Sequence, residues 1–349
     1  EVKKNLSVPS ARKVALEQLA GYVADRTREV GNRYVGILTD GVEWILYHLD
    51  NGTLSQVDDL RLSGSEDDTE RLRVWLEAIL ATEKNIKPTP QEIARRLGAE
   101  SSAYRLDHAT LTSLYRANAD LPEVSLKRQL WAKLLRTSFG KAFSDKQNLF
   151  IDHTLLVLTA EMIAHAVVGF DLAIGGLSPK ALVRGNEFAN AQIYGVVESD
   201  FFDWVLSVEG GPEFVDSLAK RIARFDWNQV EHDVLKVLYE SIIAQDERTA
   251  LGEYYTPDWL ADRMVHDAIT DPLNQKVLDP ACGSGTFLFH AIRAYLKAAE
   301  EANTPTGAAV SGLTSTVYGI DVHPVAVTLA RVTYLLAIGH ERLNAPDRG

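Results

Sequence analysis

The spacing of apolar residues along the chain changes twice, and it divides the sequence into three parts. Residues 1–70 combine short apolar runs with one helical pattern, from Ala11 to Arg26. Residues 71–245 repeat apolar positions three and four apart, which is the spacing of amphipathic helices. Residues 246–349 again place short apolar runs beside helical patterns. We therefore predict an α/β part at each end of the chain and an all-α connector between them.

The first part has the order strand, helix, strand, strand. Apolar runs occur at Tyr34–Leu38 and Val42–His48, and the dipeptides Asp40-Gly41 and Asn51-Gly52 follow them as hairpin signals. A group of acidic residues next to a Ser-Gly-Ser stretch is interpreted as a solvated linker. Its members are Asp58, Asp59, Glu66, Asp67, Asp68 and Glu70.

The middle part contains three patterns that predict packing. The run Leu155–Phe170 is strongly apolar, and Glu161 interrupts it, so we predict a buried helix rather than a membrane span. His153 and His165 are too far apart for a metal pair on one helix turn, so both are interpreted as packing or surface residues. The segment Asp200–Trp204 predicts a helix held in the core by its aromatic residues.

One further helix in this part has a leucine face and a basic face. We expect the leucines to mark one side and the basic residues to cover the remaining, solvated surface, although a basic face could also contact phosphates. The two sets are Leu126, Leu130, Leu134 and Leu135, and Lys127, Arg128, Lys133 and Arg136.

Composition narrows the class of protein only slightly. The 349 residues contain a single cysteine, Cys282, which excludes internal disulfides and cysteine zinc sites and fits a reducing, cytoplasmic location. The net charge of −12 argues against a large DNA footprint within these residues, because duplex-binding proteins are often basic. No signal peptide is evident, and no membrane partner is expected.

A glycine-containing loop near residue 280 carries the strongest chemical signal. The run Val277–Phe287 is an apolar strand, the acid Asp279, a Gly-x-Gly turn and the start of a helix. A dinucleotide fingerprint needs a third glycine, but position 288 is leucine, and a phosphate-binding P-loop needs a lysine that does not follow here. S-adenosylmethionine has an ammonium, a carboxylate and a ribose but no phosphate, so it suits this loop. A second strand, Val317–Ile320, ends in Asp321, which can accept both ribose hydroxyls.

These two strand ends and the upstream segment 252–257 (Gly-Glu-Tyr-Tyr-Thr-Pro) together resemble DNA N6-adenine methyltransferases. The resemblance is to single-chain, type IIG or type I-like, restriction–modification or phage-defence enzymes. It implies a Rossmann-like domain that binds S-adenosylmethionine, of which residues 246–349 would be the N-terminal part. The segment Glu301–Ser315 is then interpreted as an insertion between helix and strand. The implied cofactor-binding residues are Tyr254, Tyr255, Thr256, Pro257, Asp279, Gly283, Ser284, Gly285 and Asp321.

Thr256 is also expected to cap a helix that begins at Pro257. The Asn/Asp-Pro-Pro-Tyr/Phe segment that clamps the target amine in this family has no match, since the prolines after the loop are Pro305, Pro324 and Pro346. We therefore expect a fragment that binds the cofactor weakly and transfers no methyl group.

The start of the chain resembles a second family. Glu1-x-Lys3, followed on the next helix by Gln18-x-x-x-Tyr22, is similar to the C-terminal part of a restriction-endonuclease-like domain. The resemblance implies that Glu1 binds Mg²⁺ and that Lys3 and Gln18 assist phosphodiester cleavage. The alternative is an exposed ion pair at the chain end beside an ordinary helix surface.

Taken together, the motifs predict a site-specific adenine N6 methyltransferase of a restriction–modification system, with a linked Mg²⁺-dependent endonuclease and double-stranded DNA as partner. Further subunits cannot be inferred. Three alternatives stay open. These are a phage-defence methyltransferase with an inactive nuclease-like domain, an RNA or small-molecule methyltransferase with a helical binding module, and a non-enzymatic scaffold.

Overall fold

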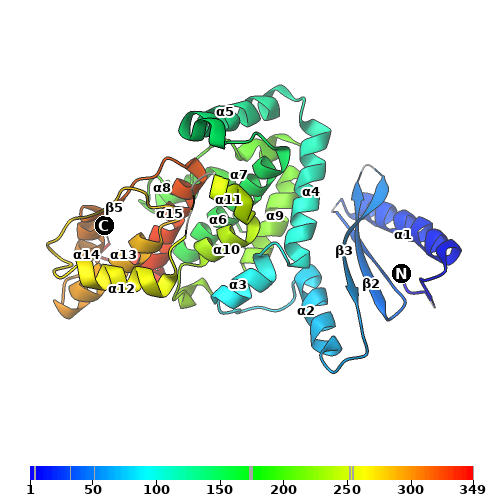
Figure 1. The fold of residues 1–349 in the computed structure, drawn as a ribbon, viewed down its shortest axis with the longest axis horizontal. Coiled ribbons are helices and arrows are strands. Elements are labelled where there is room, and N and C mark those ends of the chain that lie inside the picture. Colours follow the sequence, from blue (N-terminus) through cyan, green and yellow to red (C-terminus); the bar gives the residue numbers. More distant parts are fainter. Residues whose placement is uncertain are drawn as a thin grey trace.

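The computed structural model describes residues 1–3, 5–31, 33–50, 52–172, 176–250, 253 and 255–348. The fold is mixed α/β and mostly helical. A three-stranded sheet lies toward one end of the molecule and a two-stranded sheet toward the other, with helices between them (Figure 1). This arrangement agrees with the predicted sequence of α/β, all-α and α/β parts. The exact domain limits at residues 70 and 245 stay predictions.

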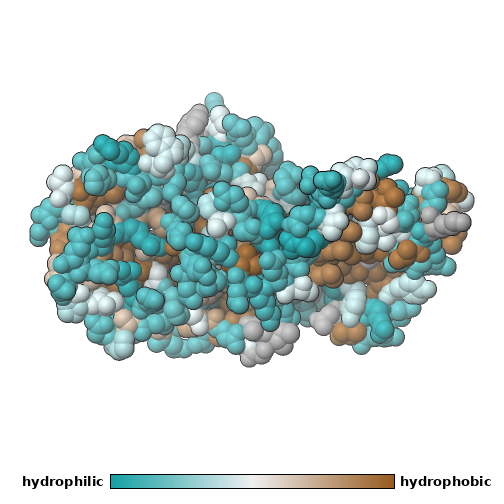
Figure 2. Space-filling view, turned by 90° about the horizontal axis from the view of Figure 1, so that it is seen from below, coloured by the Kyte–Doolittle hydropathy of each residue, from teal (hydrophilic) through white to brown (hydrophobic). Residues whose placement is uncertain are grey.

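The N-terminal part has the predicted helix followed by the two predicted strands, but the predicted first strand is a single bridge at Val2 and a third strand follows that was not predicted. Helix α1 (Pro9–Val30) packs on an antiparallel sheet of β1 (Val35–Thr39), β2 (Glu43–Asp50) and β3 (Thr53–Arg61). The chain start runs parallel to β1, because the Lys3 N–H donates to the Thr39 carbonyl at 2.9 Å. Apolar residues gather on this end of the molecule, at the right of the space-filling view (Figure 2).

The predicted acidic linker is wrong for four of its six residues, because Asp58 and Asp59 lie within β3 and Asp68 and Glu70 lie within α2 (Asp68–Leu80). Asp58 lies within β3 and is buried, and its carboxylate accepts from the Trp75 indole at 3.0 Å and pairs with Arg105 at 2.5 Å. Asp68 is also buried and accepts from the backbone N–H groups of Ser63 and Gly64, each at 2.6 Å. Buried carboxylates need such donors, so these acids hold the sheet and the first connector helix together.

The middle part is helical, as predicted, and α6 forms its centre. Helices α4, α9 and α10 pack around α6, and α15 from the C-terminal part does the same (Figure 1). The helices of this part are α2 (Asp68–Leu80), α3 (Pro90–Leu97), α4 (Ser102–Asn118), α5 (Pro122–Phe139), α6 (Gln147–Val168), α7 (Pro179–Arg184), α8 (Asn186–Asn190), α9 (Gly211–Ile222), α10 (Val234–Ile242) and α11 (Gln245–Ala250). Short 3-10 turns join them at η1 (Gly140–Ala142), η2 (Asp203–Ser207) and η3 (Trp227–Gln229).

The predicted buried helix is α6. It is long and apolar enough to cross a membrane, but 89% of its apolar window is buried by other elements of the protein. His153 and His165 are both fully buried, which confirms that they are packing residues. The Trp131 indole donates to Nδ1 of His153 at 3.2 Å. The aromatic segment before α9 forms the 3-10 turn η2 rather than an α-helix, and Trp204 is buried there as expected.

The predicted faces of α5 are wrong for three leucines and two basic residues, whereas buried Leu135 and exposed Lys133 and Arg136 lie as predicted. Leu126 and Leu130 are exposed, whereas Lys127 and Arg128 point toward the protein. Lys127 forms an ion pair with buried Asp203, and the Arg128 guanidinium lies 4.5 Å from the Trp131 ring centre. Trp131 and Leu135 lie on the buried side of α5, and the helical repeat then directs Leu126, Leu130 and Leu134 outward.

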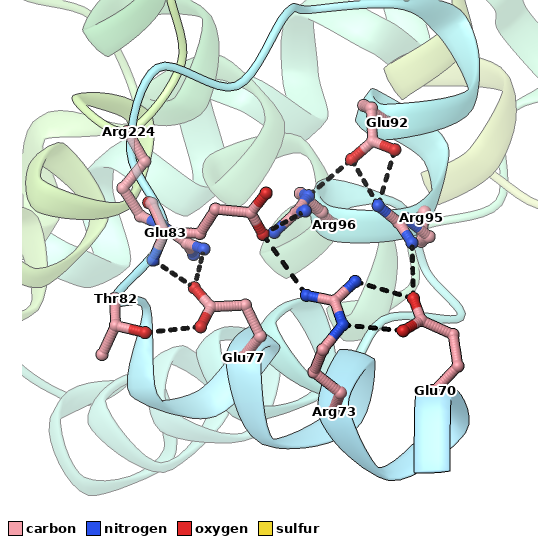
Figure 3. A network of polar contacts seen from close by, with 9 residues as sticks. All are labelled: Glu70, Arg73, Glu77, Thr82, Glu83, Glu92, Arg95, Arg96 and Arg224. Atoms are coloured by element: carbon pink, nitrogen blue, oxygen red, sulfur yellow. Dashed lines mark hydrogen bonds and ion pairs between the residues drawn. The ribbon is translucent and has the colours of Figure 1, made fainter. Parts of the chain in front are cut away.

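A network of ion pairs connects α2, α3 and the segment after α9 (Figure 3). Buried Arg96 contacts Glu92 at 2.6 Å and Glu83 at 2.7 Å, and Arg224 pairs with Glu77. The network holds the first connector helix against the rest of the helical part, because its charged groups are each satisfied by an opposite charge.

The C-terminal part contains a strand–helix–strand unit. Its elements are α12 (Asp258–Ala268), β4 (Val277–Asp279), α13 (Thr286–Glu301), α14 (Thr306–Thr314), β5 (Val317–Gly319), α15 (Pro324–Ile338) and α16 (His340–Leu343). Strands β4 and β5 are parallel neighbours, and the residues interpreted as an insertion, Glu301–Ser315, contain the whole of α14. One hydrophobic core runs from the connector into this part, and α15 packs directly on α6. The helical connector therefore supports the candidate site directly.

Candidate cofactor site

The two predicted acids lie at the same edge of the parallel sheet. Asp279 is the last residue of β4 and pairs in register with Gly319, and Asp321 follows β5 by two residues. The backbone N–H of Gly283 donates to Oδ2 of Asp321 at 2.8 Å, and the Ala281 N–H donates to Oδ1 of Asp279 at 3.1 Å. The loop after β4 is therefore held by the carboxylates of both strand ends.

Both loop glycines adopt backbone conformations that favour glycine. Gly283 has φ +54° and Gly285 has φ +99°. A Cβ at Gly285 would lie 3.2 Å from the Cα of Ala330, so this position also permits α13 to approach α15 closely. The loop then leads directly into the N-terminus of α13, whose first N–H groups are available for an anion.

A cavity of about 310 Å³ opens in front of this loop. Its walls come from four places: the loop and first turn of α13, the segment before α12, the residues after β5, and the end of α5. The lining residues are Phe139, Glu253, Tyr255, Thr256, Ala281, Cys282, Gly283, Ser284, Thr286, Phe287, Asp321, Val322, His323 and Ala326.

The electrostatic character of the cavity is acidic. Glu253 and Asp321 contribute carboxylates, and the described lining contains neither lysine nor arginine. Burial raises the pKa of Glu253 to about 7 and also raises the pKa of Asp279. Such a cavity favours a ligand that carries positive charge and disfavours a phosphate-bearing nucleotide.

Several polar atoms at the cavity lack a hydrogen-bond partner within the described residues. They are Oε1 of Glu253, Oγ of Ser284, Nε2 of His323 and, at the adjacent strand end, Oδ2 of Asp279. Buried polar groups are costly when unsatisfied, so these atoms mark where a ligand would bind. S-adenosylmethionine offers an ammonium and two ribose hydroxyls to the carboxylates, and its carboxylate can meet backbone N–H groups. The residues present therefore fit this cofactor.

The structure brings most of the predicted cofactor residues together. Tyr255, Thr256, Gly283, Ser284 and Asp321 line the cavity. Asp279 ends β4 before the lining loop, and Gly285 is the N-cap residue of α13 after it; neither residue is part of the cavity lining. Tyr254 lies outside the described residues.

The predicted helix cap is wrong. Helix α12 begins at Asp258, Pro257 occupies the capping position, and no side chain caps the helix. The Thr256 carbonyl instead accepts from the Lys236 ammonium. A tertiary contact to α10 thus fixes Thr256, which a local sequence pattern does not reveal.

Nine of the fourteen lining residues were not predicted as site residues, and three of them, His323, Glu253 and Phe139, bear on how the cavity is built. His323 caps α15, since its Nδ1 accepts from the N–H of Val325 at 3.1 Å, and the His-Pro pair that follows Asp321 could have indicated this. Glu253 lies inside the quoted motif but was given no role. Phe139 comes from α5 and packs on the His323 ring, 5.4 Å between centres. Nothing local in the sequence places Phe139 there.

The residues of the predicted nuclease motif also lie together. Lys3 Nζ contacts the Glu1 carboxylate at 2.8 Å and donates to Oε1 of Gln18 at 2.7 Å, whereas Tyr22 is 59% exposed. Glu1 is the one carboxylate of this cluster, and no group of three or more metal-ligating side chains occurs among the described residues. The donor set therefore does not fit a metal ion by itself, and Mg²⁺ at Glu1 stays a prediction.

Comparison with known protein families found a match in the C-terminal part of the chain. Residues 230–342 match the family model described as N-6 DNA Methylase. The matched segment contains α10, the cavity-lining loop and both strand-end acids.

The chain is also similar to solved structures of larger proteins. One is a DrdV–DNA complex, at 14% identity and TM-score 0.35, covering 90% of this chain and 30% of that one. Another is the ATP-dependent Type ISP restriction-modification enzyme LlaBIII bound to DNA, at 14% identity and TM-score 0.33, covering 78% and 18%. A third is a nuclease-deletion mutant of the Type ISP enzyme LlaGI with a DNA substrate mimic, at 13% identity and TM-score 0.36, covering 80% and 22%.

The chain thus spans less than a third of the length of these proteins. At such TM-scores the likeness carries no argument about the fold, and the family match is the informative finding. Residues 230–342 are similar to the N-6 DNA Methylase family, and this match confirms the resemblance of the chain to DNA N6-adenine methyltransferases.

Proposed function

We propose that the chain binds S-adenosylmethionine and belongs to a protein that methylates N6 of adenine in double-stranded DNA. The observation that carries this proposal is the acidic cavity, without lysine or arginine in its described lining, between two parallel strand ends and a helix N-terminus. The family match supports DNA as the methylated substrate. Adenine as the target base rests on the family alone, because the sequence contains no recognisable target-amine clamp.

In this proposal each side of the cavity has a separate task. Asp279 binds the ammonium, the N–H groups at the start of α13 receive the carboxylate, and Asp321 accepts the ribose hydroxyls. Asp321 is already fixed by the backbone N–H groups of Gly283 and His323, each at 2.8 Å, so its oxygens are oriented before a ligand enters. When bound, the cofactor supplies an electrophilic methyl group. The protein's contribution is alignment of that methyl with an amine from a base outside the duplex stack.

A binding comparison tests the cofactor assignment. Isothermal titration calorimetry of residues 1–349 is expected to show S-adenosylmethionine binding and no binding of ATP or NAD at the same concentration. We expect this result because the phosphates of ATP and NAD would lie near the carboxylates of Glu253 and Asp321, and the described lining has no lysine or arginine to compensate their charge. Tighter binding of ATP or NAD than of S-adenosylmethionine would reject the assignment.

A restriction–modification system is the proposed biological setting, in the cytoplasm. One observation supports an accompanying nuclease, namely the contact of Lys3 with both Glu1 and Gln18. A supercoiled-plasmid cleavage assay with a longer protein, with and without Lys3→Ala, tests it. Cleavage that persists in the variant would leave these residues as an ordinary surface cluster.

A further inference from the structure

Glu253 is a third carboxylate of the cavity, and the protein holds it on one side only. Its side chain is 14% exposed. Oε2 accepts a hydrogen bond from the Tyr239 hydroxyl at 2.5 Å. Oε1 has no hydrogen-bond partner among the described residues and lies 3.4 Å from Nε2 of His323. Glu253 therefore lines the cavity with a carboxylate whose second oxygen is buried against the His323 ring, so it acts on a ligand through its charge.

His323 cannot neutralise this carboxylate as a cation. Its Nδ1 accepts from the N–H groups of Val325 and Ala326 at 3.1 and 3.3 Å, so the ring proton belongs on Nε2 and the imidazole is neutral. Burial lowers the pKa of His323 to about 4. The rings of Phe139 and His153, with centres 5.4 and 5.3 Å away, fix its position.

The other groups around Glu253 leave its charge uncompensated on the cavity side. Asp321, after β5, adds a second negative charge, and Tyr239 of α10 and neighbouring Tyr255 are neutral phenols with raised pKa values. Among the described residues, Arg248 of α11 is the one cation whose charge acts on Glu253. Its guanidinium donates to the Ile243 carbonyl at 3.0 Å and does not line the cavity.

We propose that Glu253 is a specificity-determining residue that makes the cavity prefer the cationic sulfonium cofactor over its neutral thioether product. This inference rests on the proposed function and names how the same site tells substrate from product. When the methyl leaves for the amine, the electron pair of the S–CH₃ bond stays on sulfur, and the amine releases one proton to solvent. The bound cofactor thereby loses one positive charge, and the buried carboxylate of Glu253 then has no opposite charge from the ligand. Product release is favoured for that reason.

Calorimetry of residues 1–349 with S-adenosylmethionine and with S-adenosylhomocysteine tests the inference. Glu253→Gln keeps the shape of the side chain and removes its charge. We expect it to weaken S-adenosylmethionine binding about tenfold and to change S-adenosylhomocysteine binding less than about twofold. The matched control is Glu300→Gln near the C-terminal end of α13, an exposed carboxylate outside the described lining, which should change neither affinity.

Equal weakening of both ligands by Glu253→Gln would overturn the inference and leave the proposed function intact. Absence of binding of either ligand to the unmodified chain would overturn both. If Glu253→Gln does not fold, Tyr239→Phe serves instead, since losing its hydroxyl donor makes Glu253 harder to ionise. We expect Tyr239→Phe to weaken S-adenosylmethionine binding at pH 7, to recover it at pH 8.5, and to leave S-adenosylhomocysteine binding unchanged. The same loss for both ligands at both pH values would contradict the inference.

Discussion

The backbone N–H of Gly283 donates to the carboxylate of Asp321 across 2.8 Å, so the loop after β4 is held by the acid after β5. The two strand ends therefore act as one unit. A residue proposed to bind a ribose also supports the loop that would receive the methionine part of the ligand.

Asp321→Ala should remove both functions at once. We expect S-adenosylmethionine affinity to fall by about 2–3 kcal/mol, because charge-assisted hydrogen bonds are worth roughly this much. Calorimetry measures the loss, with exposed Asp267→Ala on α12 as the control. If both variants bind as well as the unmodified chain, Asp321 does not contact the ligand.

Gly285→Ala tests the close approach of α13 and α15. A side chain there meets positive φ and a 3.2 Å contact with backbone, so we expect a stability loss of about 1–3 kcal/mol. Gly21, inside α1, has open space around it, and Gly21→Ala should stabilise by about 0.5–1 kcal/mol. Urea denaturation measures both. Equal effects of the two substitutions would show that the loop conformation in solution differs from the one described.

Arg96→Ala tests the ion-pair network of Figure 3. Arg96 is 7% exposed and pairs with Glu92 and Glu83. Its loss leaves Glu92 with Arg95 alone and Glu83 with Arg73 at 3.8 Å, so we expect about 1–3 kcal/mol of destabilisation. Arg73 is 51% exposed, and Arg73→Ala should cost less than about 1 kcal/mol. Thermal unfolding distinguishes the two. Similar costs would mean that the network contributes little beyond surface pairing.

The pH dependence of stability should reflect buried carboxyls. Burial raises the pKa of Glu253 to about 7 and that of Asp233 to about 6. A raised folded-state pKa means that the folded chain binds more protons than the unfolded chain. The contribution of Glu253 is therefore fully present below its unfolded pKa and is lost as the pH rises through about 7. The stability of the unmodified chain relative to Glu253→Gln, measured without ligand, should therefore fall from about pH 5 to pH 8, because buried histidines such as His323 contribute equally to both chains. An identical profile in the variant would contradict the pKa of Glu253 given above.

The parts of the fold that short-range chemistry determines could be predicted from the sequence. Asp-Gly turns, the Gly-x-Gly loop and the apolar spacing of α6 each depend on residues next to one another. The failures came from contacts between distant segments. Trp131 packs inward, so α5 is oriented differently from the prediction. The Trp75 indole donates to the carboxylate of Asp58, which also pairs with Arg105. The Lys236 ammonium donates to the Thr256 carbonyl, and Thr256 does not cap a helix.

The candidate site shows the same division. Asp279 and Asp321 could be found because each follows a recognisable strand, and parallel pairing brings their ends together. Phe139 and the partners of Glu253 could not, since they come from α5 and α10. Phe139 of the connector forms part of the cavity wall, and the sequence pattern of residues 230–342 gives no indication of this residue.

The most direct test of the account is a crystal structure of residues 1–349 grown with S-adenosylmethionine. The account predicts the ligand in the cavity before the Gly283–Gly285 loop, with its ammonium at Asp279 and its ribose hydroxyls at Asp321. A ligand bound at another place, or carboxylates of Asp279 and Asp321 that do not face a common cavity, would contradict it.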